Sequence, residues 1–152
     1  MSDTKRDDPV HFRFMNEIAI IDQLGSRIFE RVMPDGMTLP QFAVLNHFVR
    51  LQRPSSPQKL ASAFQLTKGA MTNTLQHLEA KGYVRVTPDE KDRRAKVVSI
   101  TPQGSAARDA AIAALGPILR SMASAISAAD IEAALPILVR VRSFLDAERA
   151  GG

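Results

Sequence analysis

The stretch from Ser56 to Thr101, SPQKLASAFQLTKGAMTNTLQHLEAKGYVRVTPDEKDRRAKVVSIT, decides the fold of this 152-residue chain. It holds two short helical patterns separated by a few residues, then two strand patterns on either side of a charged loop. Helix, turn, helix and β-hairpin in this order predict a winged helix-turn-helix, which puts a helix in the DNA major groove and a hairpin against the backbone or minor groove. The fold class is therefore mainly α with a small β-hairpin wing (α+β).

Basic charge is concentrated in the same part of the chain. Between Arg50 and Lys96 there are ten lysine or arginine residues and four acidic ones, a net charge of +6, whereas the whole chain carries +4. The remaining residues therefore carry a net negative charge. A polyanion would bind where the positive charge gathers.

Helix start and stop signals divide this region into elements. Ser56 and Thr67 are caps for two helices, Gly82 stops the second, and Thr38 with Gln41 has the spacing of a capping box for a preceding helix. The expected elements are helices over 39–51, 57–63 and 67–81, strands over 83–86 and 97–100, and a hairpin tip over 87–96. Together they form a winged lobe over 38–101.

Long amphipathic helices flank the lobe. Their apolar residues recur with the 3.6-residue period of a helix, and Gly116-Pro117 is expected to kink the downstream pattern. A lobe of about 60 residues cannot cover so much apolar surface, so a second subunit is the simplest cover. The expected parts are a flexible N-terminal arm (1–9), a helical dimerisation region (10–36 and 102–147) and the lobe (38–101).

The second helix of the lobe has two different faces. At about 100° per residue, its polar side chains fall on one arc and Met71, Thr74, Leu75 and Leu78 on the opposite arc. Amides suit paired hydrogen bonds with adenine, a lysine suits guanine or phosphate, and a threonine methyl can meet a thymine methyl. A solvated polar face is the alternative for an isolated helix, but the neighbouring turn, wing and charge favour DNA contact. The candidate contacts are Lys68, Gly69, Thr72, Asn73, Gln76 and, between the arcs, His77.

The predicted wing carries the pattern Asp92-Arg93-Arg94. A carboxylate two residues before an arginine on a tight hairpin can hold its guanidinium, and an arginine held in this way can enter a narrow A·T-rich minor groove. We therefore predict that Asp92 positions Arg94 for DNA. Phosphate contacts are expected from Lys91, Arg93 and Lys96.

Several motifs together resemble the MarR family of multiple-antibiotic-resistance-type transcription regulators. They are KLA (59–61), LTKGAMTN (66–73), LEAKGYV (78–84), DRR (92–94) and ITPQG (100–104). The resemblance covers nearly the whole chain. It implies an obligate homodimer, joined through the first and last two helices, that represses neighbouring genes from a pseudo-palindromic operator. It also implies release by a small, often aromatic or phenolic acid bound between the dimer helices and the winged lobe.

The chain also departs from the family pattern. Many relatives have an arginine where this chain has Asn73 and another at His77, so their base preference does not transfer. The thiol-sensing branch needs a cysteine near the start of the first helix, and this chain contains no cysteine. Peroxide sensing by that chemistry is therefore excluded.

Polar or cationic residues near helix ends are candidates for an effector pocket. Such groups can meet a carboxylate, although the alternative is that they are ordinary surface or dimer-interface residues. The candidates are His11, Arg13, Asn16, His47 and Arg50.

Other classes of function lack support in the sequence. No nucleophile with a plausible base, phosphate-cradling loop or paired-carboxylate motif indicates an enzyme. The scattered histidines and absent cysteines predict no metal site or cofactor. No apolar run or leader pattern predicts a membrane span or secretion, so a cytoplasmic location is expected. A winged-helix adaptor acting through protein contacts and a DNA-binding regulator without an effector remain as alternatives.

Overall fold

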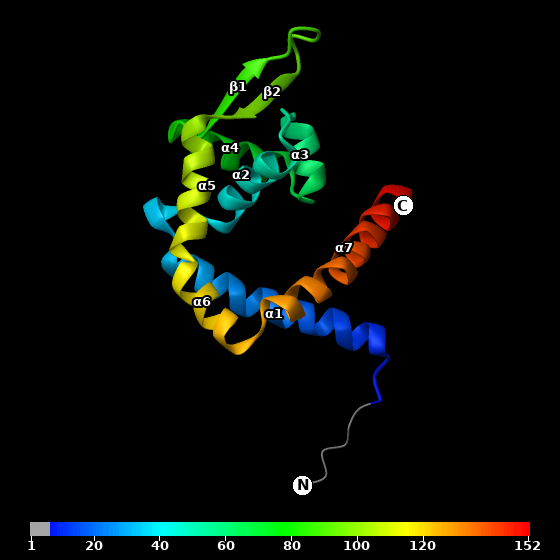
Figure 1. Ribbon diagram of the computed structural model, residues 1–152. Helices are drawn as coiled ribbons and strands as arrows, with labels where there is room; N and C mark the ends of the chain where they lie inside the picture. Colours follow the sequence, from blue (N-terminus) through cyan, green and yellow to red (C-terminus); the bar gives the residue numbers. More distant parts are fainter. Residues whose placement is uncertain (1–6) are drawn as a thin grey trace. The chain divides into compact units, whose positions relative to one another are not determined.

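The computed structural model describes residues 7–152 (Figure 1). The elements follow in the order α1 (Val10–Val32), η1 (Pro34–Gly36), α2 (Leu39–Leu51), α3 (Pro57–Ala63), α4 (Lys68–Ala80), β1 (Val84–Pro88), β2 (Lys96–Ile100), α5 (Pro102–Ala114), α6 (Gly116–Ala125) and α7 (Ala128–Gly151). Of the predicted N-terminal arm, residues 1–6 lie outside the described residues, and 7–9 lead into α1. The chain divides into two compact units, one ending at Leu115 and the other running from Gly116 to Gly152.

A winged helix-turn-helix lobe forms the centre of the first unit. Helices α2, α3 and α4 enclose one apolar core with the two strands, and Leu45, Leu60 and Leu78 are fully buried. The buried residues of this core are Met37, Val44, Leu45, Phe48, Leu60, Ala61, Met71, Leu75, Leu78, Val84 and Val98. The predicted fold class, mainly α with a β-hairpin wing, is confirmed.

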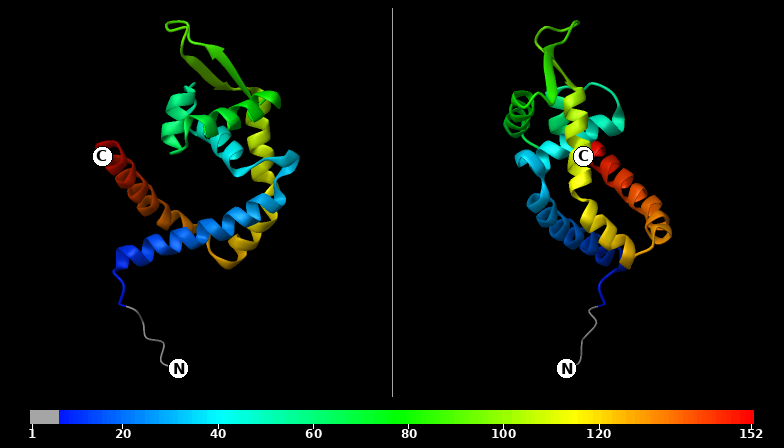
Figure 2. Two further views of the ribbon diagram at one scale, coloured as in Figure 1. Left: turned by 180° about the vertical axis from the view of Figure 1, so that it is seen from behind. Right: turned by 60° about the vertical axis from the view of Figure 1, so that its left-hand side comes forward.

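The hairpin is antiparallel, with Val84 opposite Ile100 and Pro88 opposite Lys96. Both strands extend nearer to the tip than the sequence predicted, because the pairing continues past the apolar residues that mark them. Ser55, before α3, adds two backbone hydrogen bonds of 2.8 and 3.0 Å to Val98 and so anchors β2 to the helices. The wing projects from the lobe in each view of Figure 2.

Helices α1 and α5 also pack on the lobe. The Phe29 ring of α1 meets the Phe42 ring of α2 edge to face, with centroids 5.0 Å apart. Arg108 of α5 donates two hydrogen bonds of 3.1 and 3.2 Å to the Asn46 side-chain oxygen of α2. The structure thus places α5 in the same compact unit as the lobe, while its predicted part in dimerisation stays a prediction.

The predicted helix caps are present. Thr38 and Gln41 form the capping box, and the side chains of Ser56 and Thr67 each accept a hydrogen bond from the backbone N–H three residues later. Thr101 and Ser127 cap α5 and α7 in the same way. Gly82 ends the α4 region with a φ of 76°. The predicted kink at Gly116-Pro117 is a full break, since α5 ends at Ala114 and α6 begins at Gly116.

The second unit consists of α6 and α7. Neither helix has a buried residue, although both carry many large apolar side chains. Pro136 lies inside α7 without ending the helix. Among residues 7–152 no single helix is long and apolar enough to cross a membrane, and α6 and α7 meet that criterion only as a pair bent by 103°.

Candidate nucleic-acid interface

Helix α4 presents a polar face to solvent. Met71, Thr74, Leu75 and Leu78 are buried, as predicted, and hold the opposite face in the core. All of the predicted contacts on the polar face are exposed: Lys68, Gly69, Thr72, Asn73, Gln76 and His77. The tertiary structure therefore places these six residues on one accessible surface.

The polar groups on this face differ in how they are engaged. The Thr72 hydroxyl donates to the Lys68 carbonyl at 2.8 Å, which leaves its methyl group for an outside contact. The Nδ1 of His77 lies 2.8 Å from the Asn73 carbonyl, and because a carbonyl only accepts, this nitrogen carries the proton. Within the described part of the chain, the Lys68 ammonium group and the side-chain amides of Asn73 and Gln76 have no hydrogen-bond partner. They are free to bind a ligand.

The tip of the wing is shaped by two aspartates. The Asp89 carboxylate accepts the Lys91 backbone N–H at 2.9 Å, and the Asp92 carboxylate accepts the Arg94 backbone N–H at 3.0 Å. The predicted contact between Asp92 and the Arg94 guanidinium is therefore wrong. A carboxylate on a tight turn reaches the N–H two residues later at shorter range than it reaches the end of a long side chain.

The wing thus presents its cations without internal ion pairs. The salt bridges among residues 7–152 join Arg108 to Asp109 and Arg149 to Asp146, and neither involves the hairpin. The exposed cations of the wing are Lys91, Arg93, Arg94 and Lys96. A hairpin tip with unpaired positive charges suits a phosphate backbone or a narrow groove.

Three contacts join the base of the wing to the end of α4, and the turn after α4 to the start of α5. The Glu79 carboxylate at the end of α4 accepts the Val86 N–H of β1 at 3.1 Å. The Thr101 hydroxyl donates to the Gly82 carbonyl at 2.6 Å, and the Thr101 N–H donates to the Tyr83 carbonyl at 3.0 Å. Helix and wing therefore form one surface with a fixed geometry.

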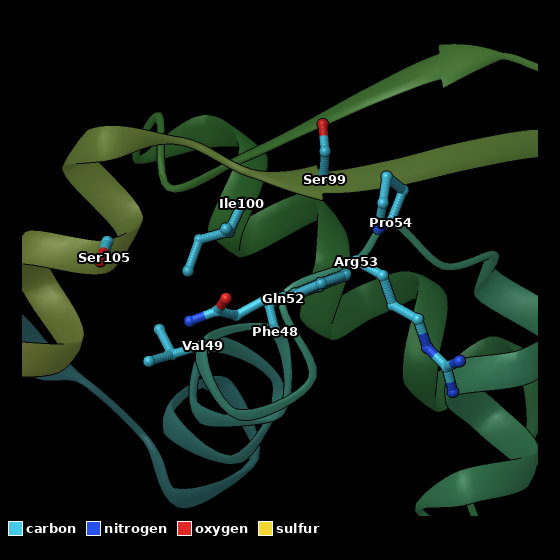
Figure 3. Close-up of a pocket in the computed structure, with 8 residues that line it drawn as sticks. All are labelled: Phe48, Val49, Gln52, Arg53, Pro54, Ser99, Ile100 and Ser105. Atoms are coloured by element: carbon cyan, nitrogen blue, oxygen red, sulfur yellow. The ribbon is translucent and has the colours of Figure 1, made fainter.

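A cavity of about 380 Å³ lies between the end of α2, the end of β2 and the start of α5. Its lining residues are Phe48, Val49, Gln52, Arg53, Pro54, Ser99, Ile100 and Ser105. In Figure 3 the Gln52 amide lies close to Val49, below Ile100, while the Arg53 guanidinium extends away from them. No local pattern in the sequence marks this cavity.

The predicted effector residues do not line this cavity. His11, Arg13 and Asn16 are exposed on α1, and Arg50 is exposed near the end of α2. The remaining one, His47, is half-buried and packs edge to face on the Phe64 ring, with centroids 5.4 Å apart. Their assignment to an effector pocket stays a prediction.

The surroundings of His47 disfavour the protonated form of its imidazole. Burial lowers its pKa from the ordinary value of 6.5, and the positive charges of Arg50 and Arg53 lower it further. The imidazole is therefore neutral at physiological pH.

In the described range no group of three or more His, Cys, Asp or Glu residues is arranged to hold a metal ion.

The lobe, its amide-bearing helix and its cationic wing define a winged helix-turn-helix protein. A sequence model of the MarR family matches residues 35–95. The transcriptional regulator BldR from Sulfolobus solfataricus has a similar crystal structure, with a TM-score of 0.74 and 30% identity over 88% of this chain and 94% of BldR. The chain belongs to the MarR family, in agreement with the resemblance of its motifs.

Two curated relatives are regulators of opposite kinds. The chain is 32% identical over 98 residues to the transcriptional activatory protein BadR of Rhodopseudomonas palustris, over 61% of this chain and 53% of BadR. It is 28% identical over 131 residues to the HTH-type transcriptional repressor NicR of Pseudomonas putida, over 86% of this chain and 80% of NicR. The chain thus spans about half the length of BadR. Both relatives are regulators of transcription, in agreement with the prediction that this chain is not an enzyme.

Proposed function

We propose that the chain is a sequence-specific DNA-binding regulator of transcription. The observation that carries the proposal is the combined surface of α4 and the wing, where unpartnered amides lie beside unpaired cations. Amides on a helix read base edges, and cations on a hairpin neutralise phosphates. A regulator of this kind acts on chromosomal DNA, so we place it in the cytoplasm.

A selection from randomised DNA duplexes tests this proposal. We expect the full chain to enrich one inverted-repeat sequence and to bind it with an affinity that falls steeply as salt rises. The matched control is Asn73→Asp, which keeps the size of the side chain but places a carboxylate on the DNA face. Equal enrichment by the control, or an affinity independent of salt, favours the protein-protein adaptor instead.

The apolar surface supports a homodimer. Helices α6 and α7 have no buried residue, and α1 buries only Phe29. Exposed apolar side chains on these helices include Phe12, Ile21, Leu24, Leu119, Met122, Leu135 and Phe144. A single chain leaves this surface in water, whereas a second copy covers it. Sedimentation is expected to give twice the 16.6 kDa of one chain, and a stable 16.6 kDa species at micromolar concentration contradicts the proposal.

Repression is the proposed direction of control. NicR, which is a repressor, aligns with 86% of this chain, while the activator BadR aligns with 61%. A reporter gene downstream of the selected DNA sequence is expected to fall in expression when the chain is produced. A rise in expression contradicts repression without contradicting DNA binding.

Release by a small effector completes the proposal. The cavity beside β2 and the predicted residues on α1 and α2 are two candidate places for it. Ligands found by thermal shift are expected to lower DNA affinity. If the ligand binds in the cavity, Ile100→Ala weakens its binding. If it binds at the predicted residues on α1 and α2, His47→Gln weakens its binding instead. The alternative, a regulator without an effector, predicts that no compound that binds the chain changes its DNA affinity.

A further inference from the structure

Lys81 is exposed, but its ammonium group is engaged by two acceptors of the same unit. Lys81 follows α4 directly, and its Nζ donates to the Asp35 carbonyl at 3.0 Å and to the Gln41 side-chain oxygen at 3.2 Å. These acceptors lie in η1 and in the first turn of α2, about 40 residues earlier in the chain. One side chain therefore joins the turn between α1 and α2, and the start of α2, to the end of α4.

The side-chain oxygen of Gln41 relies on Lys81 for a hydrogen bond. The glutamine is a buried polar residue, with 7% of its surface exposed. Its side-chain oxygen also accepts the Thr38 N–H, but at 3.5 Å, which is at the limit for a hydrogen bond. Lys81 is thus the main partner of a buried acceptor, and its removal leaves that oxygen poorly satisfied.

The hydrogen bond from Lys81 also stabilises the backbone turn at Asp35. Its backbone is left-handed, with a φ of 54°, which is uncommon and costly for a residue with a side chain. The following Gly36 has a φ of 64°, so the chain turns sharply between α1 and α2. The bond from Lys81 to the Asp35 carbonyl holds this turn against the end of α4.

The ring of Tyr83 lies beside the ammonium group. The Lys81 Nζ is 5.9 Å from the ring centroid, within the range of a cation–π contact. Tyr83 begins the connection to the wing, and its backbone carbonyl accepts the Thr101 N–H. The charge of Lys81 therefore meets the α1–α2 turn, α2 and the base of the wing together.

We propose that Lys81 is a positioning residue for DNA binding, which fixes the end of α4 against the turn between α1 and α2 and contacts no phosphate. The proposal rests on the proposed DNA-binding function. If it holds, Lys81 is not one of the DNA-contacting cations among the ten basic residues between Arg50 and Lys96. The proposal also makes Lys81 the link through which a movement of that turn reaches α4.

A salt series on Lys81→Met tests the proposal. Methionine keeps much of the aliphatic stem and removes the charge. We expect operator affinity to fall about tenfold, because α4 loses its support. The plot of log affinity against log salt concentration keeps its slope, because no phosphate contact is lost. The matched control is Lys91→Met in the wing, which is expected to reduce the magnitude of that slope by about one for each copy bound.

A double variant tests the route through Gln41. If Lys81 acts through this residue, Lys81→Met combined with Gln41→Met loses less affinity than the product of the two single losses. Losses that multiply overturn the proposal, as does a reduced salt slope in Lys81→Met. A lower unfolding temperature with unchanged affinity of the folded protein assigns Lys81 a purely structural role and also overturns it. Failure of the unaltered chain to bind DNA refutes the proposed function itself, so the two failures are distinguishable.

Discussion

Gly104→Ala is expected to destabilise the protein, because the first turn of α5 has no space for a side chain at this position. A Cβ there would overlap the Tyr83 carbonyl oxygen and lie 2.9 Å from Cγ1 of Ile100. The carbonyl cannot retreat freely, since it accepts the Thr101 N–H at 3.0 Å. Thr101 is held in turn by its 2.6 Å bond to Gly82 and by the Gly104 N–H, which donates to its hydroxyl at 3.0 Å.

The size of the loss follows from these contacts. Forcing an extra carbon into a filled site costs about 1–3 kcal/mol. Weakening the hydrogen bond to Tyr83 costs roughly 1 kcal/mol more. Alanine recovers about 1 kcal/mol through its higher helix propensity. The expected net loss is about 1–3 kcal/mol, which for a chain of this length lowers the unfolding temperature by roughly 2–12 °C.

Thermal unfolding followed by circular dichroism measures this loss. All samples need the same protein concentration, because unfolding of a dimer depends on it. Gly69→Ala is the matched control, since Gly69 lies near the start of α4 and a Cβ added there would meet nothing within 4 Å. We expect the control to unfold at or slightly above the wild-type temperature. If Gly104→Ala also unfolds at that temperature, the steric argument is refuted.

Three further predictions concern the DNA surface and pH. Arg94→Ala is expected to weaken operator binding by about 1–3 kcal/mol, and Asp92→Ala by less, because its carboxylate shapes only the tip backbone; equal affinity of Arg94→Ala and wild type at physiological salt contradicts this role. Asn73→Ala is expected to flatten the preference among operator variants, whereas Lys91→Ala lowers binding to all of them, so a selection in which only Lys91→Ala changes the consensus reverses the assignment. The lowered pKa of His47 means that the unfolded chain binds this proton more readily, so stability is full above pH 6.5 and falls as pH drops through that value. His47→Gln should flatten the dependence of unfolding free energy on pH just below 6.5, and an unchanged curve assigns it to other groups.

Local signals in the sequence predict the elements of the lobe closely. The helix over 39–51 has its predicted bounds, because Thr38, Gln41 and Pro40 are all start signals that act within one turn. The predicted polar and buried faces of α4 are also correct, since helical periodicity alone separates Lys68 from Met71. The strands are predicted less accurately, because their pairing extends through polar residues as far as Pro88 and Lys96.

Side-chain contacts between distant or flexible residues are not predictable in the same way. The spacing of Asp92 and Arg94 predicts an ion pair, but the carboxylate binds the backbone N–H. Lys81 contributes to the basic charge that indicates DNA binding, but its partners lie about 40 residues away within the protein. The cavity beside β2 joins residues from α2, β2 and α5, and no local pattern marks such a meeting point.

By itself, the sequence determined the order and type of the elements, the face of α4 that meets the core and the basic charge of the lobe. These properties follow from helical and strand periodicity, caps and composition, which act over a few neighbouring residues. Only the tertiary structure decided that Gly104 has no room for a side chain against Tyr83. It also decided that the Asp92 carboxylate binds the Arg94 backbone N–H, and that the Lys81 ammonium group binds Asp35 and Gln41. Each of these depends on how packed elements bring atoms within a few ångströms of one another, and such distances are set by the whole core and not by any one segment.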